Sequence, residues 1–244
     1  MIETPPDQLA DEGFVAFRQG RDGEAQQLFE RSAELAREHG DRQVLMQALG
    51  GLARVALRAG ETHRTRELAL EALELADDEA TQWSPRHLLA AAARAEGDYD
   101  RAQALYGETL ALARRLDLRI AEAAELLNLG YVALHLGQTE RAVERFRESL
   151  EIGAELKDDY LLPYCLLGAG SSALLRGDAA EGATRLAAAK AAFDAAGATI
   201  DPGSAEEYEA AVADARRRLG DAFDAVWAEG SRLSLSQAIE RALG

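Results

Sequence analysis

The hydrophobic positions along this chain recur with helical spacing and are interrupted by regularly placed glycines. Between Ala121 and Leu136, apolar residues fall every three to four positions, which is typical of a helix with a wide buried face. Gly137 follows and predicts the end of this helix, and a second apolar stripe begins at Ala142. No run of strand-favouring Val, Ile and Thr is present, so the pattern predicts an all-α chain.

This helix–turn–helix pattern recurs along the chain in one register. The turn glycines are Gly20, Gly60, Gly97, Gly137 and Gly177, and an alanine stands four residues before each. A small residue five positions after the glycine precedes a large one, and the large positions are Phe29, Tyr106, Phe146 and Leu186, with Ala69 as the exception. A fixed period of this length predicts a stacked-repeat solenoid, whose second unit packs loosely at Thr65 and Ala69. We expect repeats at 7–40, 42–78, 82–117, 119–157 and 159–197.

The register is lost after residue 197, and the remaining segment has the pattern of C-terminal capping helices. Residues 197–203 are predicted as a loop that leads to a helix with Ser204 as its N-cap. A short helix is expected at 221–229, and Ser234 and Gln237 form a capping-box pattern before a last helix. The expected organisation is therefore a repeat region over 1–197 and capping helices over 198–244.

Two segments resemble the tetratricopeptide repeat. Residues 97–106 are close to the turn and second helix of that family, and residues 128–133 resemble its first helix. The resemblance covers about residues 7 to 197 and implies a right-handed α-α superhelix of five repeats. The period of 37 to 40 residues departs from the usual 34 of the family. We expect the extra residues to lengthen the helices and the turns between repeats.

The tail from Leu219 to Leu243 is similar to the end of the repeat region in bacterial signal-transducing ATPases, including LuxR-type and SARP-type transcription regulators. This resemblance implies a regulatory region of such a signal-transduction protein. The chain has no phosphate-binding G-x-x-x-x-G-K-[ST] motif and no evident helix-turn-helix after Leu243. It is therefore expected to be either an excised sensor region or a freestanding relative.

Charge and composition exclude several classes of protein. The formal net charge of −16 disfavours direct contact with nucleic acid. No signal segment and no long apolar run are present, so we expect a cytoplasmic protein without a membrane span. Cys165 is the single cysteine and is expected to be a buried apolar residue, so no internal disulfide forms.

No catalytic or cofactor-binding pattern is found in the sequence. The histidines His39, His63, His87 and His135 lack the spacing of a zinc site, and no nucleophile motif or glycine-rich phosphate loop is present. Carboxylate pairs such as Asp158 and Asp159 lie near helix ends, where they favour helix starts. We therefore expect no enzyme activity, no metal and no cofactor.

The candidate site is the face that the first helices of the repeats expose on the concave side. Projection of the register places a set of cationic, aromatic and polar residues there without a carboxylate: Phe14, Arg18, Arg54, Arg58, His87, Arg94, Asn128, Tyr131, His135, Tyr164 and Ser171. Such a set predicts a groove for an acidic peptide, protein segment or small anion. The alternative is that the arginines pair with acids on neighbouring second helices.

These patterns predict a non-catalytic protein-interaction and ligand-sensing scaffold, the regulatory region of a bacterial transcription regulator. A ligand in the groove would change the curvature of the repeat stack or block a partner surface. Two further hypotheses are a freestanding adaptor and a peptide-binding receptor. The set does not reproduce the lysine-and-asparagine clamp of chaperone-binding tetratricopeptide domains, so a chaperone tail is disfavoured. Ligand identity and oligomeric state are left open by the sequence.

Overall fold

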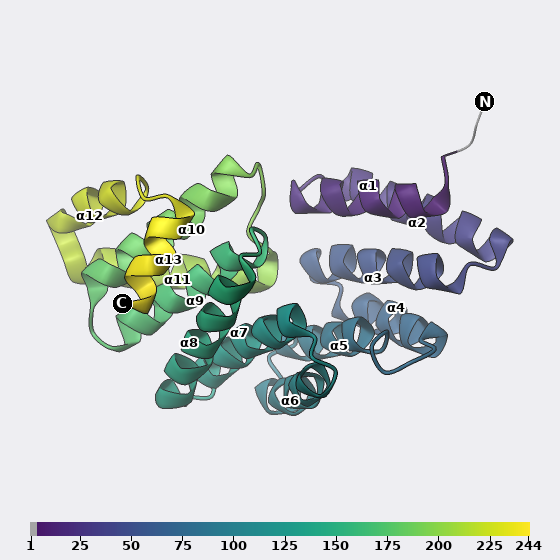
Figure 1. Cartoon of the computed structure of the whole chain (residues 1–244), viewed down its shortest axis with the longest axis horizontal. Helices are drawn as coiled ribbons and strands as arrows, with labels where there is room; N and C mark the ends of the chain where they lie inside the picture. The colour runs from purple at the N-terminus through teal and green to yellow at the C-terminus, as the bar shows by residue number, and fades with distance from the viewer. Residues whose placement is uncertain (1–3) are drawn as a thin grey trace. The chain divides into compact units, whose positions relative to one another are not determined.

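The computed structural model of the protein describes residues 4–244, and the regular elements within that range are all helices (Figure 1). The prediction of an all-α repeat fold is confirmed. The chain divides into two compact units after Leu112, a boundary that the sequence does not indicate. The helices are α1 (Pro6–Arg18), α2 (Asp22–His39), α3 (Arg42–Arg58), α4 (Thr62–Leu75), α5 (Trp83–Ala95), α6 (Tyr99–Arg115), α7 (Arg119–His135), α8 (Thr139–Leu156), α9 (Leu161–Leu175), α10 (Ala179–Ala195), α11 (Pro202–Leu219), α12 (Phe223–Gly230) and α13 (Leu235–Leu243).

The five periodic glycines end the first helices of the repeats, as the sequence predicts. Each has a positive φ, from +70° at Gly137 to +89° at Gly177, which side chains with a Cβ rarely adopt. The residue after each glycine then donates its backbone N–H to the alanine four positions before the glycine, at 2.8 Å for Gln138 to Ala133. This bond closes a Schellman turn and satisfies a carbonyl that the helix end leaves free.

A second left-handed position recurs at the turns between repeats. It is occupied by Gly40 and Gly197, but also by Asp117 and Lys157, whose φ values are 53° and 54°. Asp117 and Lys157 are not recognisable as turn positions in the sequence, because neither is a glycine. A non-glycine residue in this conformation carries strain, since its Cβ approaches the following carbonyl oxygen.

Aromatic side chains of the second helices fill the space between successive first helices. A Cβ on Gly130 of α7 would lie 2.4 Å from the ring of Phe146, and one on Gly168 of α9 would lie 2.7 Å from it. Phe29 of α2 is held in the same way between Gly13 and Gly51. These glycines therefore let the helix backbones approach the buried rings, as the sequence pattern of small and large positions predicts.

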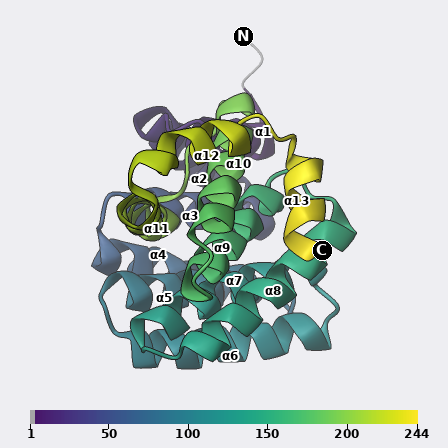
Figure 2. The same cartoon turned by 90° about the vertical axis from the view of Figure 1, so that its left-hand side faces the viewer.

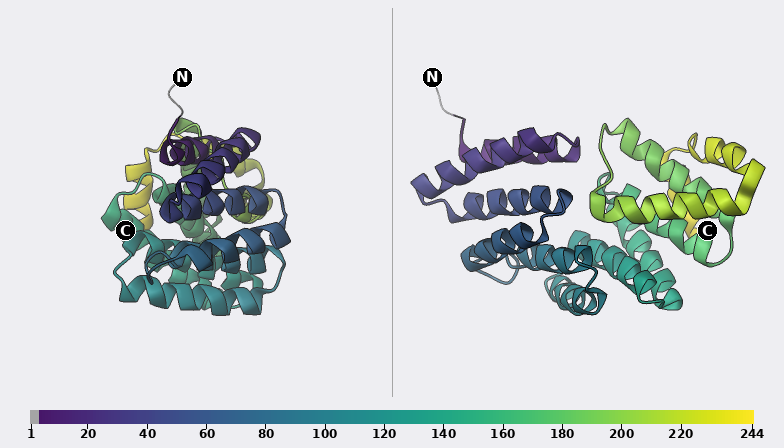
Figure 3. Two further views of the ribbon diagram at one scale, coloured as in Figure 1. Left: turned by 90° about the vertical axis from the view of Figure 1, so that its right-hand side faces the viewer. Right: turned by 180° about the vertical axis from the view of Figure 1, so that it is seen from behind.

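The N-terminal unit is a stack of helix pairs. In Figure 3 the helices α1 to α4 lie alongside one another, and α3 packs on both α2 and α4. Its core is rich in alanine, including Ala48, Ala53, Ala69 and Ala72. Ala53 and Ala69 are both fully buried, and the loose packing expected at Ala69 stays a prediction. Within residues 4–244, no helix has the length and apolar character that a membrane crossing requires.

The C-terminal unit ends in three helices that pack on the last repeat. Helix α11 begins at Pro202 with Asp201 as its N-cap, so the prediction of Ser204 as the cap is wrong. Proline suits a first helical position because its missing N–H would have no helical partner there, and the helix therefore starts earlier. Helix α12 lies across α10 (Figure 2), where a Cβ on Gly230 would meet the backbone of Thr184 at 2.4 Å. The predicted capping box of Ser234 and Gln237 is present at α13.

Candidate functional site

The first helices of the N-terminal unit enclose a hollow of about 110 Å³, called here the first-helix hollow. It lies among three first helices, α1, α3 and α5, and most of its lining is apolar. Side chains predicted to face a ligand, Phe14 and Arg54, are part of this lining. The remaining lining includes Met46, Gly50, Ser84 and Pro85.

Arg54 and Arg58 lie one turn apart on α3 but have different environments. Arg58 donates to the Phe17 carbonyl and to Asp22 of α2, both at 2.8 Å, and its guanidinium lies 3.6 Å from the centre of the Phe17 ring. These bonds join α3 to the preceding repeat, and the Arg58 side chain is only 9% exposed. The prediction that Arg58 faces a ligand is therefore corrected. Arg54 is half-buried, and no hydrogen-bond or ion-pair partner is found for it within residues 4–244.

The other predicted residues of this unit lie outside the hollow. Arg18 is exposed at the end of α1, and Arg94 is half-buried near the end of α5; each interacts with other groups of the chain. His87 lies between two aromatic rings, 5.2 Å from Trp83 and 5.7 Å from Tyr106. The structure therefore brings Phe14 and Arg54 together at one hollow and leaves these three residues apart from it.

In the C-terminal unit, the predicted aromatic anchors are buried. Tyr131 is 1% exposed and packs edge-to-face on Phe146 at 5.0 Å. The hydroxyl of Tyr164 accepts the backbone N–H of Asp201 at 3.3 Å, and its ring packs on Phe193. Burial raises the pKa of Tyr164 well above its ordinary value. Both tyrosines belong to the core, and their prediction as exposed contacts is wrong because ring packing and the start of α11 cover them.

Helix α11 also contacts the helices that carry the other predicted residues of this unit, α7 and α9. It packs on α9 and α10, and its Glu207 lies 3.5 Å from His135 of α7. Its Arg218 donates to the Leu174 carbonyl at 2.8 Å. Ser171 is buried, and the Asn128 amide donates to the Ala124 carbonyl of its own helix at 2.9 Å. Helix α11 therefore contacts part of the face that the sequence assigned to a ligand.

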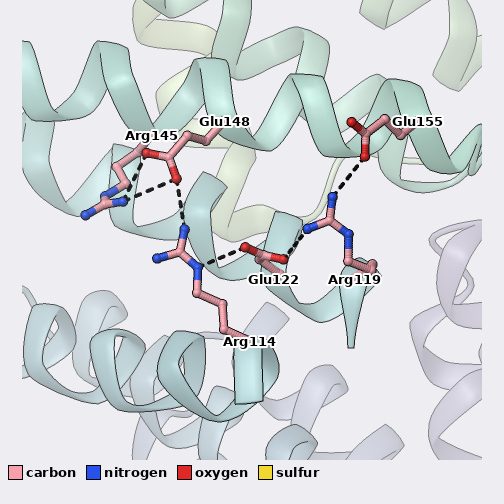
Figure 4. A network of polar contacts seen from close by, with 6 residues as sticks. All are labelled: Arg114, Arg119, Glu122, Arg145, Glu148 and Glu155. Atoms are coloured by element: carbon pink, nitrogen blue, oxygen red, sulfur yellow. Dashed lines mark hydrogen bonds and ion pairs between the residues drawn. The ribbon is translucent and has the colours of Figure 1, made fainter. Parts of the chain in front are cut away.

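A polar network joins the end of α6, the start of α7 and α8 (Figure 4). Glu122, whose side chain is 10% exposed, accepts from Arg114 at 2.9 Å and from Arg119 at 2.6 Å. Arg114 also bonds Glu148, and Arg119 bonds Glu155, each at 2.9 Å. The hydrogen bond that Arg114 donates to Glu122 raises the pKa of Arg114, so this guanidinium stays charged.

Part of this network has a counterpart in the first two repeats. The pairs Arg37–Glu71 and Arg114–Glu148 both span 34 residues and join consecutive second helices. They therefore act as links between repeats rather than as a chemical site. The signal for these pairs in the sequence is an arginine followed by a glutamate 34 residues later, which the helical periodicity alone does not reveal.

A larger groove of about 290 Å³ lies between α2 and α4, and we call it the second-helix groove. Its floor is formed by α3, and carboxylates and arginines line its walls. None of the residues predicted from the sequence to face a ligand lines this groove.

Among residues 4–244, we find no group of side chains with the arrangement of a catalytic centre. Within residues 4–244, no three His, Cys, Asp or Glu side chains are grouped as metal ligands. Cys165 is fully buried as predicted, and burial raises the pKa of its thiol to about 12. A thiol with so high a pKa is protonated at neutral pH and is a poor nucleophile.

Comparisons with known proteins support the repeat assignment. Residues 83–155 match the tetratricopeptide repeat model, and residues 13–56 match the model of anaphase-promoting complex subunit 5. No curated protein sequence matches the chain significantly.

Solved structures of similar fold cover nearly the whole chain. A Rap protein complexed with Competence and Sporulation Factor has a TM-score of 0.63 at 16% identity, covering 96% of this chain and 73% of its own. BtubC (BKLC) from P. vanneervenii has a TM-score of 0.58 at 16% identity, covering 98% and 91%. The apo form of RapI has a TM-score of 0.55 at 15% identity, covering 96% and 72%. At these identities the likeness establishes a shared tetratricopeptide-type fold.

Proposed function

We propose that this chain is a non-catalytic tetratricopeptide-repeat scaffold that binds an acidic peptide or protein segment at the first-helix hollow. The observation that carries the proposal is Arg54, a half-buried guanidinium without an internal partner beside a mostly apolar hollow. A guanidinium held in this way forms charge-assisted hydrogen bonds with a carboxylate. The apolar lining by Phe14, Met46 and Pro85 suits a neighbouring apolar side chain of the ligand.

The site in this proposal is smaller than the residue set predicted from the sequence. Arg58 already bonds Asp22, and Tyr131 and Tyr164 are buried. The first-helix face of the C-terminal unit is in contact with α11. The proposed site is therefore restricted to the N-terminal unit and depends on Arg54.

The test is peptide binding by the full chain and by single-residue variants. An array of acidic peptides, each with one large apolar residue beside Asp or Glu, is screened, and affinities are measured by fluorescence anisotropy. We expect Arg54→Glu to weaken the selected peptides by at least tenfold. Arg101→Glu, an exposed arginine on α6, is the charge-matched control and leaves the affinity unchanged. Equal binding by Arg54→Glu, or no binding by the parent chain, would refute the proposal.

We further propose a regulatory role for this binding in a cytoplasmic bacterial signal-transduction protein. Two observations support it: the tail at 219–243 is similar to that of bacterial signal-transducing regulators, and a Rap protein of the same fold was solved with Competence and Sporulation Factor. The alternatives are a freestanding adaptor and a peptide-binding receptor. If the regulatory role is correct, a saturating acidic peptide changes the small-angle scattering profile of the chain, and an unchanged profile contradicts it.

A further inference from the structure

The second-helix groove is a separate surface from the first-helix hollow. The groove is lined on α3 by Leu49, Leu52 and Ala56, whereas the hollow is lined on α3 by Met46, Gly50 and Arg54. At about 100° per residue, the centres of these two sets lie roughly 130° apart around the helix axis, on different faces of α3. A ligand in one surface therefore leaves the other accessible.

The floor and the walls of the groove differ in chemistry. The floor is apolar and includes Leu52, which is half-buried, and Leu68 of α4. The walls carry four carboxylates, those of Glu30, Glu34, Glu61 and Glu71, against two guanidiniums, those of Arg37 and Arg64.

Both wall guanidiniums are already engaged, and one carboxylate is not. Arg37 bonds Glu71 at 2.7 Å, and Arg64 bonds Glu67 at 3.4 Å. The Glu61 side chain is exposed and has no partner within residues 4–244. The groove therefore combines an apolar floor with a net negative rim.

The groove is particular to the first two repeats and is not a general property of the fold. At the position equivalent to Ala33, the next three repeats carry Leu73, Leu110 and Leu150. At the position equivalent to Ala59, the fourth repeat carries Leu136. Ala33 and Ala59 both line the groove, so small side chains leave open a space that leucine would narrow, as at the Ala33 position of the next three repeats.

We propose that the second-helix groove binds an amphipathic helix of a partner protein, whose apolar side chains are flanked by lysine or arginine. Charge complementarity selects the basic flanks, because the rim carries more carboxylates than guanidiniums. The described residues offer no strand edge for backbone pairing, so the partner binds through side chains. A trough between α2 and α4 with an apolar floor suits the stripe that an amphipathic helix presents at i, i+3, i+4 and i+7.

The test selects helical peptides from a randomised phage-displayed library against the full chain and measures the purified peptides by fluorescence anisotropy. We expect the selected sequences to be amphipathic with a net positive charge. Ala59→Leu fills the groove without a change of charge and weakens binding by at least tenfold. Ala59 is exposed at the C-cap of α3, so this variant keeps the circular dichroism spectrum and melting temperature of the parent.

A charge pair and a distant control complete the experiment. Glu61→Lys weakens the basic peptides by at least fivefold, whereas Glu144→Lys on α8 leaves them within twofold. Arg54→Glu also leaves their affinity unchanged, which separates this groove from the proposed acidic-peptide site. Selected peptides that are acidic, or that bind Ala59→Leu as tightly as the parent, would overturn the proposal.

Discussion

The replacement of Gly130 by alanine tests whether close contact between a glycine and a buried ring holds consecutive repeats together. An added Cβ would lie 2.4 Å from Cε1 of Phe146, which is fully buried. The ring cannot shift away easily, because Gly168 of the next first helix faces it from another side, where a Cβ would lie 2.7 Å away. The alanine must therefore displace the ring or the α7 backbone.

The expected loss follows from two opposing effects. Overpacking of a well-filled core costs about 1–3 kcal/mol, and the upper end applies where the neighbour is confined. Alanine recovers about 1 kcal/mol through its higher helix propensity. The net loss in free energy of unfolding is about 2 kcal/mol, which corresponds to a decrease in melting temperature of roughly 4–8 °C for a chain of this size.

Gly107 provides the matched control. It lies in the interior of α6, is exposed, and an added Cβ would meet nothing within 4 Å. Gly107→Ala therefore raises the free energy of unfolding by about 0.5–1 kcal/mol. Urea unfolding followed by circular dichroism at 222 nm measures both variants. Phe146→Leu in the Gly130→Ala background recovers at least half of the loss if the clash with the ring is its cause.

Equal stability of Gly130→Ala and Gly107→Ala would refute the expected clash between the added Cβ and the Phe146 ring. A loss that Phe146→Leu does not relieve would equally contradict it, because the cost would then come from elsewhere than the ring.

Four further predictions concern other parts of the molecule. Lys157→Gly relieves the strain of a positive φ and raises the free energy of unfolding by about 0.5–1 kcal/mol in the same urea assay; an unchanged midpoint would show that the turn is not strained. Ser234→Ala removes the capping box of α13 and lowers the helix signal by fraying, with a stability cost of about 1 kcal/mol. Glu122→Gln costs about 2 kcal/mol because two arginines lose a charged acceptor, whereas Glu151→Gln, in an exposed pair, stays within about 0.5 kcal/mol. The thiol of Cys165 resists a disulfide reagent at pH 8 until urea unfolds the chain. Its pKa rises from 9.0 to about 12 on folding, so the unfolded state loses the thiol proton at lower pH than the folded state. The free energy of unfolding therefore falls as the pH rises from 9.0 to about 12, and it falls less steeply in Cys165→Ala.

The repeat fold was predictable from the sequence because its determinants are local and periodic. A positive φ strongly favours glycine, so the regular spacing of glycines such as Gly20 and Gly137 after apolar helical stripes marks the turns. The large and small positions of each second helix were found for the same reason. Asp117 and Lys157 adopt the same left-handed conformation although neither is a glycine, so residue type does not reveal them.

The candidate site was predictable only in part, because side-chain partners come from distant elements. Arg54 and Arg58 stand one turn apart and look equivalent in the register. Only the structure shows that Asp22 of α2 reaches Arg58. The burial of Tyr164 likewise depends on α11, a helix outside the repeats, whose position no periodic pattern specifies.

The position of α11 leaves the N-terminal unit as the part of the chain with an uncovered first-helix hollow. A solenoid exposes its first-helix face unless a further element covers it. In the C-terminal unit that element is α11, which contacts α9 and α10 and places Glu207 beside His135. The N-terminal unit retains a hollow beside Arg54 on one side of α3 and a groove lined by Ala33 and Ala59 on the other. Arg54→Glu is therefore expected to weaken acidic peptides at the first-helix hollow, and Ala59→Leu to weaken basic amphipathic peptides at the second-helix groove.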